Sequence, residues 1–124
     1  MGLGLKYMIK VKNKLGTIHI SGAVLTILTG DAATNCFGVK GMALRNVSDG
    51  LVHLLKMESM GKGVNIIYND DGTISVSLHI VVDQGVNLPV VCKSIMRQVR
   101  YKLSAAAAVE VKNIDIFVDT MMVN

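Results

Sequence analysis

The clearest hydrophobic pattern in the chain lies in its middle, where two apolar stretches flank a polar turn. Apolar and polar residues alternate five times over residues 74–83, and the shorter apolar stretch 64–68 precedes them. The segment between them, Asn-Asp-Asp-Gly at 69–72, is typical of a tight turn. This pattern predicts a half-buried β-hairpin. The side chains predicted to point away from the core are Ser75, Ser77, His79, Val81 and Asp83.

Two longer segments have the 3.6-residue periodicity of amphipathic helices. The first follows Ser21, a favourable N-cap residue, and is expected to end at Gly38. The second begins at Asn87 and holds Pro89 in its first turn, where the missing N–H costs no hydrogen bond. Its predicted apolar face consists of Leu88, Val91, Cys92, Ile95, Val99, Leu103 and Ala106. A short extra helix, capped by Ser48, is predicted over residues 49–57.

Extended segments near both ends complete the pattern. Residues 16–21 and 114–119 each alternate apolar with polar or outward-pointing side chains. The order is therefore strand, helix, strand, strand, helix, strand. Because each element has one apolar face, we predict an α+β fold of two layers, in which an antiparallel four-stranded sheet carries both main helices on one face. Residues 1–13 are predicted to be a lysine-rich extension, and residues 14–124 a single domain.

Composition adds the protein class to this picture. Apolar residues make up 51% of the 124 residues, charged residues 18%, and the net charge is +4, as in one folded globular domain. The N-terminal stretch lacks the features of a signal peptide, and no apolar run is long enough to cross a bilayer, so we expect a cytoplasmic protein. The mean hydropathy of +0.47 and outward-pointing Ile67, Val81 and Phe117 indicate partner surfaces, or residues that lie under loops.

Residues suited to catalysis are scarce, and we predict no catalytic site and no cofactor. His19 and His79 are predicted to share the outward sheet face with Asp115 and Asp119, a set that would suit zinc if neighbouring strands brought it together. Ordinary polar residues on a wet face are the favoured alternative, so no metal is predicted.

Two further features are interpreted as structural. The turn before Asn87 resembles an anion site at a helix start, but Asn87 supplies its own capping oxygen and Pro89 removes a donor. Cys36 and Cys92 are not arranged as a CxxC pair, and two buried thiols inside helices are the favoured interpretation over a disulfide or metal site.

Three cations of the second long helix form the main candidate binding feature. Lys93, Arg97 and Arg100 fall within roughly 60° of one another, opposite the apolar face. Such a stripe is most often a solvated face; its functional alternatives are an acidic protein partner or nucleic-acid phosphate. On the outward sheet face, Phe117 is the one aromatic available for stacking on bases, and acidic residues flank it, which argues against nucleic acid as a partner. Lys93, Arg97, Arg100 and Phe117 are therefore the candidate partner-binding residues.

Six short motifs, in order and with matching spacing, resemble the alkaline-shock-protein family of Gram-positive bacteria, the envelope stress response proteins. The resemblance covers roughly residues 14–121 and is closest to the short YloU-like branch. Its motifs are "LGTIHIS" (15–21), "AATNCFGVKGM" (32–42), "DGLVHLLK" (49–56), "GKGVNI" (61–66), "SVSLHIVVDQGVNLPVV" (75–91) and "VRYKL" (99–103).

The resemblance implies a non-enzymatic scaffold protein at the cytoplasmic side of the cell envelope, peripheral at the inner face of the membrane. It implies association with itself and with membrane-anchored relatives, and contact with the membrane only through such partners. A fatty-acid-kinase-like protein is a further implied partner, because genes of this branch commonly stand beside one for such a protein. A nucleic-acid-binding module that uses the basic helix face is the alternative function. The chain departs from the family pattern at Gln84, Ala108 and Thr120, of which the last two replace glycines, so the second helix is expected to stop differently.

Overall fold

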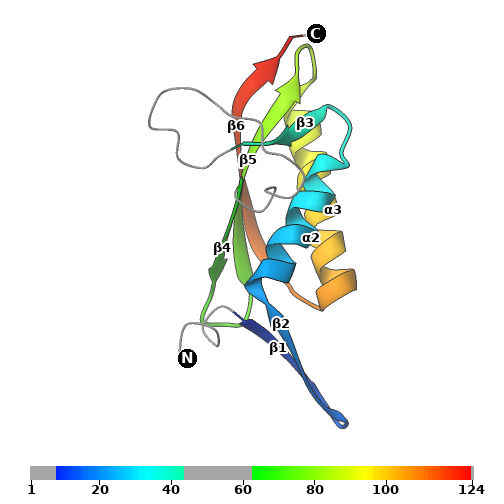
Figure 1. Ribbon diagram of the computed structural model, residues 1–124, viewed down its shortest axis with the longest axis vertical. Coiled ribbons are helices and arrows are strands. Elements are labelled where there is room, and N and C mark those ends of the chain that lie inside the picture. The colour runs from blue at the N-terminus through cyan, green and yellow to red at the C-terminus, as the bar shows by residue number, and fades with distance from the viewer. Residues whose placement is uncertain (1–7, 44–62, 124) are drawn as a thin grey trace.

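The computed structural model describes residues 8–43 and 63–123, and Figure 1 shows a sheet with two helices packed against one of its faces. The predicted α+β class is confirmed. The described elements are β1 (Met8–Asn13), β2 (Gly16–Ser21), α2 (Gly22–Thr34), β3 (Val39–Met42), β4 (Val64–Tyr68), β5 (Ile74–Asp83), α3 (Leu88–Ala107) and β6 (Val111–Met122). The short helix predicted over 49–57 lies outside the described residues.

Strand β5 is the centre of the main sheet and pairs with three other strands. The predicted hairpin is confirmed, because β4 pairs antiparallel with the first half of β5, from Tyr68 opposite Ile74 to Val64 opposite Leu78. Strand β3 pairs antiparallel with the far end of β5, and β6 pairs with β5 along its whole length. Strands β3 and β4 thus share the edge of β5 that β6 does not occupy.

The direction of β6 corrects the prediction of a wholly antiparallel sheet, because β6 runs parallel to β5. The physical reason lies in the connection between the two strands. Helix α3 has 20 residues and is about 30 Å long, so it carries the chain back along the full length of the ten-residue strand β5. The chain then re-enters the sheet at the end where β5 began, and the two strands point the same way.

The first predicted strand is also placed differently from the prediction. Residues 16–21 do form strand β2, but β2 pairs with β1 in a separate two-stranded sheet, and β3 takes the predicted place in the main sheet. This ribbon, residues 8–21, projects from the body of the molecule in Figure 1 and is called the arm below. Most of β1 falls within the predicted lysine-rich extension 1–13. The domain boundary at residue 14 stays a prediction.

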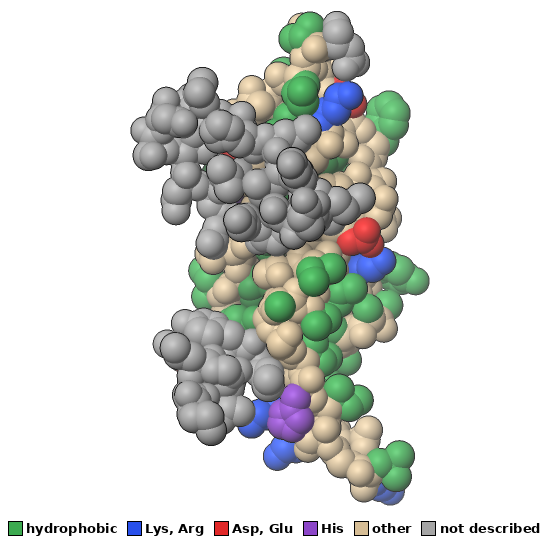
Figure 2. Space-filling view, viewed as in Figure 1, with side chains coloured by type: hydrophobic (Ala, Val, Ile, Leu, Met, Phe, Trp, Pro, Cys, Tyr) green, Lys and Arg blue, Asp and Glu red, His purple; other side chains and the backbone are tan. Residues whose placement is uncertain are grey.

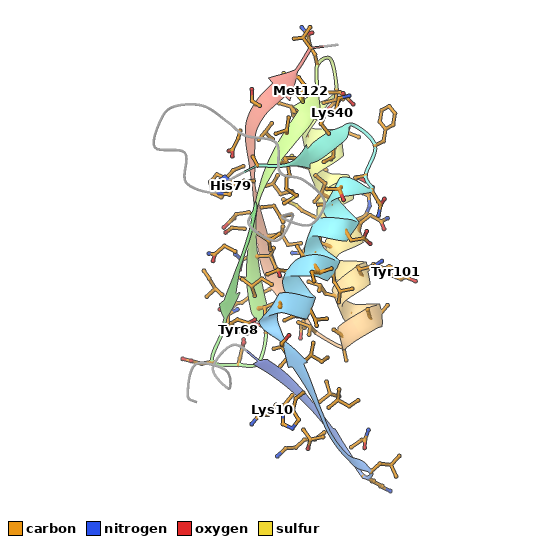
Figure 3. The ribbon with its side chains drawn as sticks, viewed as in Figure 1. Lys10, Lys40, Tyr68, His79, Tyr101 and Met122 are labelled. Carbon is orange, nitrogen blue, oxygen red and sulfur yellow. The ribbon has the colours of Figure 1, made fainter. Side chains whose placement is uncertain are left out.

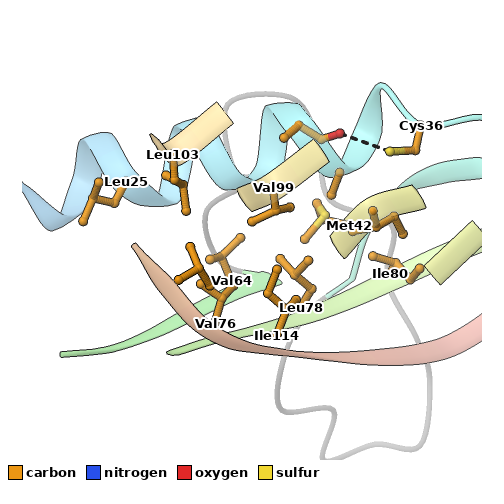
Figure 4. Close-up of a cluster of buried hydrophobic side chains, with 14 of the residues drawn as sticks. Leu25, Cys36, Met42, Val64, Val76, Leu78, Ile80, Val99, Leu103 and Ile114 are labelled. Atoms are coloured by element: carbon orange, nitrogen blue, oxygen red, sulfur yellow. Dashed lines mark hydrogen bonds between the residues drawn. The ribbon is translucent and has the colours of Figure 1, made fainter. Parts of the chain in front are cut away.

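The core lies between the helices and the inner face of the main sheet (Figure 4). Helix α3 contributes Val91, Ile95, Val99 and Leu103, as predicted, whereas its last buried residue is Ala107 rather than Ala106. Strand β5 contributes the predicted inward set of Ile74, Val76, Leu78, Ile80 and Val82.

Val81 is buried although it was predicted to point outward, and only 1% of it is exposed. It does not belong to the core cluster, which includes its neighbours Ile80 and Val82, so β5 keeps its alternation and Val81 is buried on the other face of the sheet. Each strand beside this part of β5 has one extra residue in the pairing, Lys40 in β3 and Asp119 in β6, which forms a β-bulge.

The helix ends follow local sequence signals closely in α3 and less closely in α2. Asn87 caps α3, with its Oδ1 atom accepting a hydrogen bond from the N–H of Val90 at 3.2 Å. Ser21 is the N-cap residue of α2, but its side chain makes no capping hydrogen bond. Helix α2 ends at Thr34, earlier than predicted, so Cys36 is buried just beyond the helix instead of within it.

Helix α3 stops at the position that the resemblance marked as unusual. Ala108 adopts the left-handed conformation, with φ of 55° and ψ of 35°. Its N–H donates to the carbonyl of Ser104, and the next N–H, that of Val109, donates to the carbonyl of Leu103. The chain therefore ends this helix in the way that a glycine would allow most easily, but with an alanine.

Candidate functional site

A strip of exposed side chains runs along the solvent side of α3. Val90, Lys93, Arg97 and Tyr101 follow one another at intervals of three or four residues, which places them in line on a helix, and Arg100 lies beside them. All five are exposed, with Tyr101 70% and Val90 60% exposed. In Figure 3, Tyr101 points away from the body of the molecule. The predicted positions of the three cations on the outer face of this helix are therefore confirmed.

These cations are available for a partner. In the described part of the chain, no salt bridge or side-chain hydrogen bond involves Lys93, Arg97 or Arg100. By contrast, Lys102 on the same helix reaches across to Asp31 of α2, with Nζ and Oδ2 3.1 Å apart. The strip thus combines cations without an ion-pair partner with an exposed aromatic ring, and arginine and tyrosine are among the residues most enriched at energetic centres of protein interfaces.

Helix α2 is apolar on nearly every side. Asp31 is its one charged residue, and its buried side is formed by Leu25, Thr29, Gly30, Ala32 and Ala33. Its solvent side nevertheless includes Val24 and Ile27, which are 44% and 61% exposed. Figure 2 shows hydrophobic side chains gathered over this helix. Because a helix without a polar side is normally buried, the exposed side of α2 indicates a surface that another molecule covers.

An exposed phenylalanine follows α2. Phe37 is 92% exposed, although Cys36 and Gly38 on either side of it are buried. Gly38 has a φ of 90°, and a Cβ atom there would lie 3.0 Å from a side-chain carbon of Val86. The backbone carbonyl of Gly38 also accepts a hydrogen bond from the N–H of Asp83 at 2.9 Å. The aromatic ring is therefore presented to solvent by a firmly held backbone.

A shallow polar groove of about 390 Å³ lies between the two helices next to Phe37. Asp31 and Asn35 line it from α2 and its C-cap, and Ser94, Gln98 and Lys102 line it from α3. Small-molecule sites are mostly apolar and enclosed, so this groove fits a contact region between polar surfaces better than a metabolite pocket.

The exposed apolar, aromatic and basic side chains described above for α2, α3 and the residues just after α2 form one surface, which we call the helical face. Its residues are Val24, Ile27, Phe37, Val90, Lys93, Arg97, Arg100 and Tyr101.

Phe117, the fourth predicted partner-binding residue, lies on the opposite side of the molecule. Ile114 of β6 packs in the core beneath the helices, and Phe117, an odd number of residues further along the strand, faces away from them. Its ring stacks on that of His79, with centroids 4.7 Å apart and planes 12° from parallel. The structure therefore brings Lys93, Arg97 and Arg100 together but does not bring Phe117 to them.

His79 also pairs with the residue at the β6 bulge. Its Nδ1 atom lies 2.9 Å from Oδ2 of Asp119, and both side chains are about four-fifths buried. A carboxylate that orients a histidine occurs in catalytic triads, but in the described residues no hydroxyl or thiol side chain is hydrogen-bonded to His79. The pair and the stacked Phe117 instead tie β5 to β6 on the outer face.

The four residues of the possible zinc set are not brought together. His79 and Asp119 meet, whereas His19 lies on the arm, opposite Lys10 in the separate ribbon. In residues 8–43 and 63–123, no group of three or more histidine, cysteine or carboxylate side chains is placed to hold a metal ion. None of the described helices is long and apolar enough to cross a membrane.

The two thiols have the properties of packing residues. Cys36 is buried and its Sγ atom donates to the carbonyl of Ala32 at 3.4 Å. Cys92 is partly buried within α3, and desolvation by burial raises the pKa of its thiol. A raised pKa keeps the thiol protonated near neutral pH, where only the thiolate would be a nucleophile.

Sequence analysis identified the basic residues of the helical face and missed its apolar ones. Ile27 and Phe37 lie within the first predicted helix, and neither was predicted to be a partner-binding residue. The signal that would have found them is the near absence of charge along residues 22–34, since a helix packed on a sheet needs only one apolar side.

The fold and this surface define a small α+β domain whose exposed apolar and basic side chains are suited to contacts with macromolecules. The comparisons with known proteins agree with this class. The chain belongs to the alkaline shock protein 23 family, which is described as having a cell envelope-related function and whose model matches residues 10–123. The family predicted from the sequence motifs is thereby confirmed.

Similar proteins occur in Bacillus subtilis and Streptococcus pyogenes. The chain is 29% identical to the uncharacterized protein YloU of Bacillus subtilis over 116 residues, which is 93% of this chain and 96% of the relative. It is 31% identical to the uncharacterized protein Spy1614 of Streptococcus pyogenes over 116 residues, 93% of this chain and 95% of the relative. A second B. subtilis protein, the uncharacterized YqhY, is 31% identical over 84% of this chain and 76% of its own length. No solved structure matches the chain.

Proposed function

We propose that this protein is a non-enzymatic scaffold of the cell envelope that acts at its cytoplasmic side through contacts with copies of itself and with other proteins. The observation that carries the proposal is the helical face, where apolar and aromatic side chains surround cations that have no ion-pair partner in the described chain. The family's cell envelope-related function supports the location. Membrane-anchored relatives and a fatty-acid-kinase-like protein are the candidate partners besides the protein itself.

The composition of the helical face specifies what a partner must offer. Ile27, Phe37 and Tyr101 gain by being removed from water, so the partner needs an apolar area of similar extent. Lys93, Arg97 and Arg100 require carboxylates at the margin of that area, because cations desolvated without a partner oppose binding. An acidic surface with an apolar centre satisfies both conditions.

The proposal is tested by the mass of the purified protein and by crosslinking in the cell. We expect light scattering to show a mass that rises with protein concentration, and crosslinking in the native host to capture envelope proteins. Arg97→Glu and Tyr101→Ala should each weaken association by about thirtyfold or more, since truncation of a central interface residue costs about 2 kcal/mol or more.

Matched controls lie outside the helical face. Lys112→Glu makes the same charge change on β6, and Ile67→Ala removes an apolar side chain that is 53% exposed on β4. Both should leave association unchanged. A protein that is monomeric at every concentration and crosslinks to no envelope protein would contradict the proposed function.

Nucleic-acid binding is the second candidate function, and the cations of α3 favour it because none of them has an ion-pair partner among the described residues. A gel-shift series with duplex DNA across salt concentrations separates the two candidates. Phosphate binding should weaken steeply with salt and weaken further in Arg97→Glu. The position of Phe117 opposite the helical face counts against stacking of bases beside the cations. No shift at low salt would remove this candidate.

A further inference from the structure

The arm is a two-stranded ribbon with a rigid turn at its tip. Asn13 closes the turn, with its Oδ1 atom accepting hydrogen bonds from the N–H of Leu15 at 2.7 Å and the N–H of Gly16 at 3.2 Å. Leu15 at the apex is 98% exposed. The arm forms no ladder with the main sheet, and it extends beyond the helices in Figure 1. A leucine is thus held at the most distant point of a projecting element.

The register of the arm gives it one apolar side. Ile9 pairs with Ile20 and Val11 pairs with Ile18, so these four side chains share a side. Ile9 and Ile20 pack against the core at the base, whereas Ile18 toward the tip is 53% exposed. A two-stranded ribbon is only marginally stable alone in water, so the outer part of the arm benefits from a surface that covers it.

The charge of the arm has a single sign. Lys10, Lys12 and Lys14 lie on it, and the first carboxylate side chain of the whole sequence is that of Asp31. None of the three lysines forms a salt bridge with any residue of the described chain. Figure 2 shows lysine and histidine side chains along the arm, with hydrophobic side chains near its tip. The surface that binds the arm is therefore expected to be anionic, because it must complement the charge of these lysines.

We propose that the arm binds directly to the surface of an anionic lipid bilayer, with Leu15 entering the interface and the lysines contacting lipid phosphates. An apolar tip surrounded by lysines matches the two forces that hold peripheral proteins on such a membrane, namely burial of apolar side chains and attraction to anionic headgroups. Direct contact between this chain and the lipid goes beyond the proposed function. It also differs from what the family resemblance implied, namely contact with the membrane only through partner proteins. The cell envelope-related function of the family agrees with it.

The spacing of the lysines fits entry by the tip. Lys14 adjoins Leu15, and Lys12 pairs with Thr17 one step from the turn, within about 10 Å of the apex at roughly 3.4 Å per residue. The polar headgroup layer on each side of a bilayer is about 5–7 Å thick. With Leu15 at the boundary of the hydrocarbon, Lys14 lies within the headgroup layer, and the long side chain of Lys12 reaches back to the phosphates from just outside it. A protein groove that accepts the tip, or a nucleic acid that binds the lysines, is distinguished below.

Sedimentation of the full chain with vesicles provides the first test. We expect binding to vesicles of phosphatidylcholine with phosphatidylglycerol, little binding to phosphatidylcholine alone, and a decline as salt rises. Lys12→Gln with Lys14→Gln should lower the apparent affinity about thirtyfold, at about fivefold per lysine near an anionic surface. Leu15→Ser should lower it about tenfold through loss of apolar burial. The matched control, Lys40→Gln with Lys112→Gln, removes two exposed lysines that lie outside both the arm and the helical face, and it should bind as the unchanged protein does.

The absence of tryptophan from the sequence provides a second, direct test. The emission of Leu15→Trp should shift to the blue on addition of phosphatidylglycerol vesicles, as the indole leaves water. Phe37→Trp places a comparably exposed reporter on the helical face and should not shift. Both substitutions are at positions more than 90% exposed, so neither is expected to disturb folding.

The outcomes separate this proposal from the others. No binding of the unchanged protein to anionic vesicles overturns it, as does equal loss of binding in the arm variants and in the lysine control. Binding to duplex DNA that matches vesicle binding and does not depend on Leu15 would identify a general polyanion site and overturn it too. The vesicle assay contains no partner protein, so its result is independent of the tests of the proposed scaffold function. Lipid binding can be found while the scaffold function fails, and the scaffold function can be found while lipid binding fails.

Discussion

The substitution Ala108→Gly tests the account of how α3 ends. Ala108 is the one non-glycine residue with positive φ in the described chain, at 55°. An L-residue in the left-handed conformation is strained by its Cβ atom, at a cost of about 1–2 kcal/mol. Glycine removes that atom without disturbing the hydrogen bonds from the N–H groups of Ala108 and Val109 to the helix.

The expected gain is smaller than the strain, because glycine also gives the unfolded chain more freedom. That entropy favours unfolding by about 0.5–1 kcal/mol. The net effect is a stabilisation of about 0.5–1 kcal/mol, which for a domain of 124 residues raises Tm by roughly 2–4 °C.

Ala105→Gly is the matched control, because it makes the same chemical change three residues earlier, at an exposed position within α3. There the backbone is right-handed and glycine brings only the entropic cost, so this variant should lose about 1 kcal/mol and melt at a lower temperature. Urea and thermal unfolding followed by circular dichroism measure both variants. If Ala108→Gly were destabilised as Ala105→Gly is, the left-handed cap would be refuted.

Three further predictions concern the core, the thiols and pH. Leu78→Ala, at a fully buried position of β5, should lose about 2–5 kcal/mol in urea unfolding; a loss below about 1 kcal/mol would contradict its packing. Cys36 and Cys92 should react with iodoacetamide much more slowly in the folded protein than in urea, because the first is buried and burial raises the pKa of the second; equal rates would contradict this. The side-chain and backbone hydrogen bonds from Thr73 lower the pKa of Asp71, so the turn they form gains stability above the ordinary carboxyl pKa and loses it as pH falls through the lowered value. The amide shift of Thr73, followed by NMR, should therefore titrate below the midpoint of free aspartate, and a midpoint at or above it would be contradictory.

The parts of the fold that local patterns determine were predictable from the sequence. The β4–β5 hairpin followed from an alternation beside a turn, and the start of α3 followed from Asn87 and Pro89, whose roles depend on neighbouring residues only. The core face of α3 followed from its periodicity, with an error of one residue at Ala107.

The parts that depend on distant residues were not predictable. The direction of β6 is set by the length of α3 and by which edge of β5 is free, and no local pattern records either. The burial of Val81 on the outer face of the sheet depends on residues distant in the sequence, and the pairing of β2 with β1 depends on a segment interpreted as an extension.

The candidate site was predictable in its charges and not in its full extent. Lys93, Arg97 and Arg100 lie on one helix, so periodicity alone placed them together. Phe117 was predicted on the outward sheet face from its alternation with Ile116 and Val118, and it lies there, away from the three cations. The exposed positions of Phe37 and Tyr101 were not predictable, because they depend on how α2 and α3 pack against each other.

The pairing of β5 with β6 along its whole length has a consequence during synthesis. Strand β5 leaves the ribosome well before β6, and the whole of α3 must be translated between them. Throughout that interval one edge of the ten-residue strand β5 has no partner of its own to pair with. An unpaired edge readily recruits strands from other chains, so nascent copies that crowd on one messenger are most prone to aggregate just before the last strand appears.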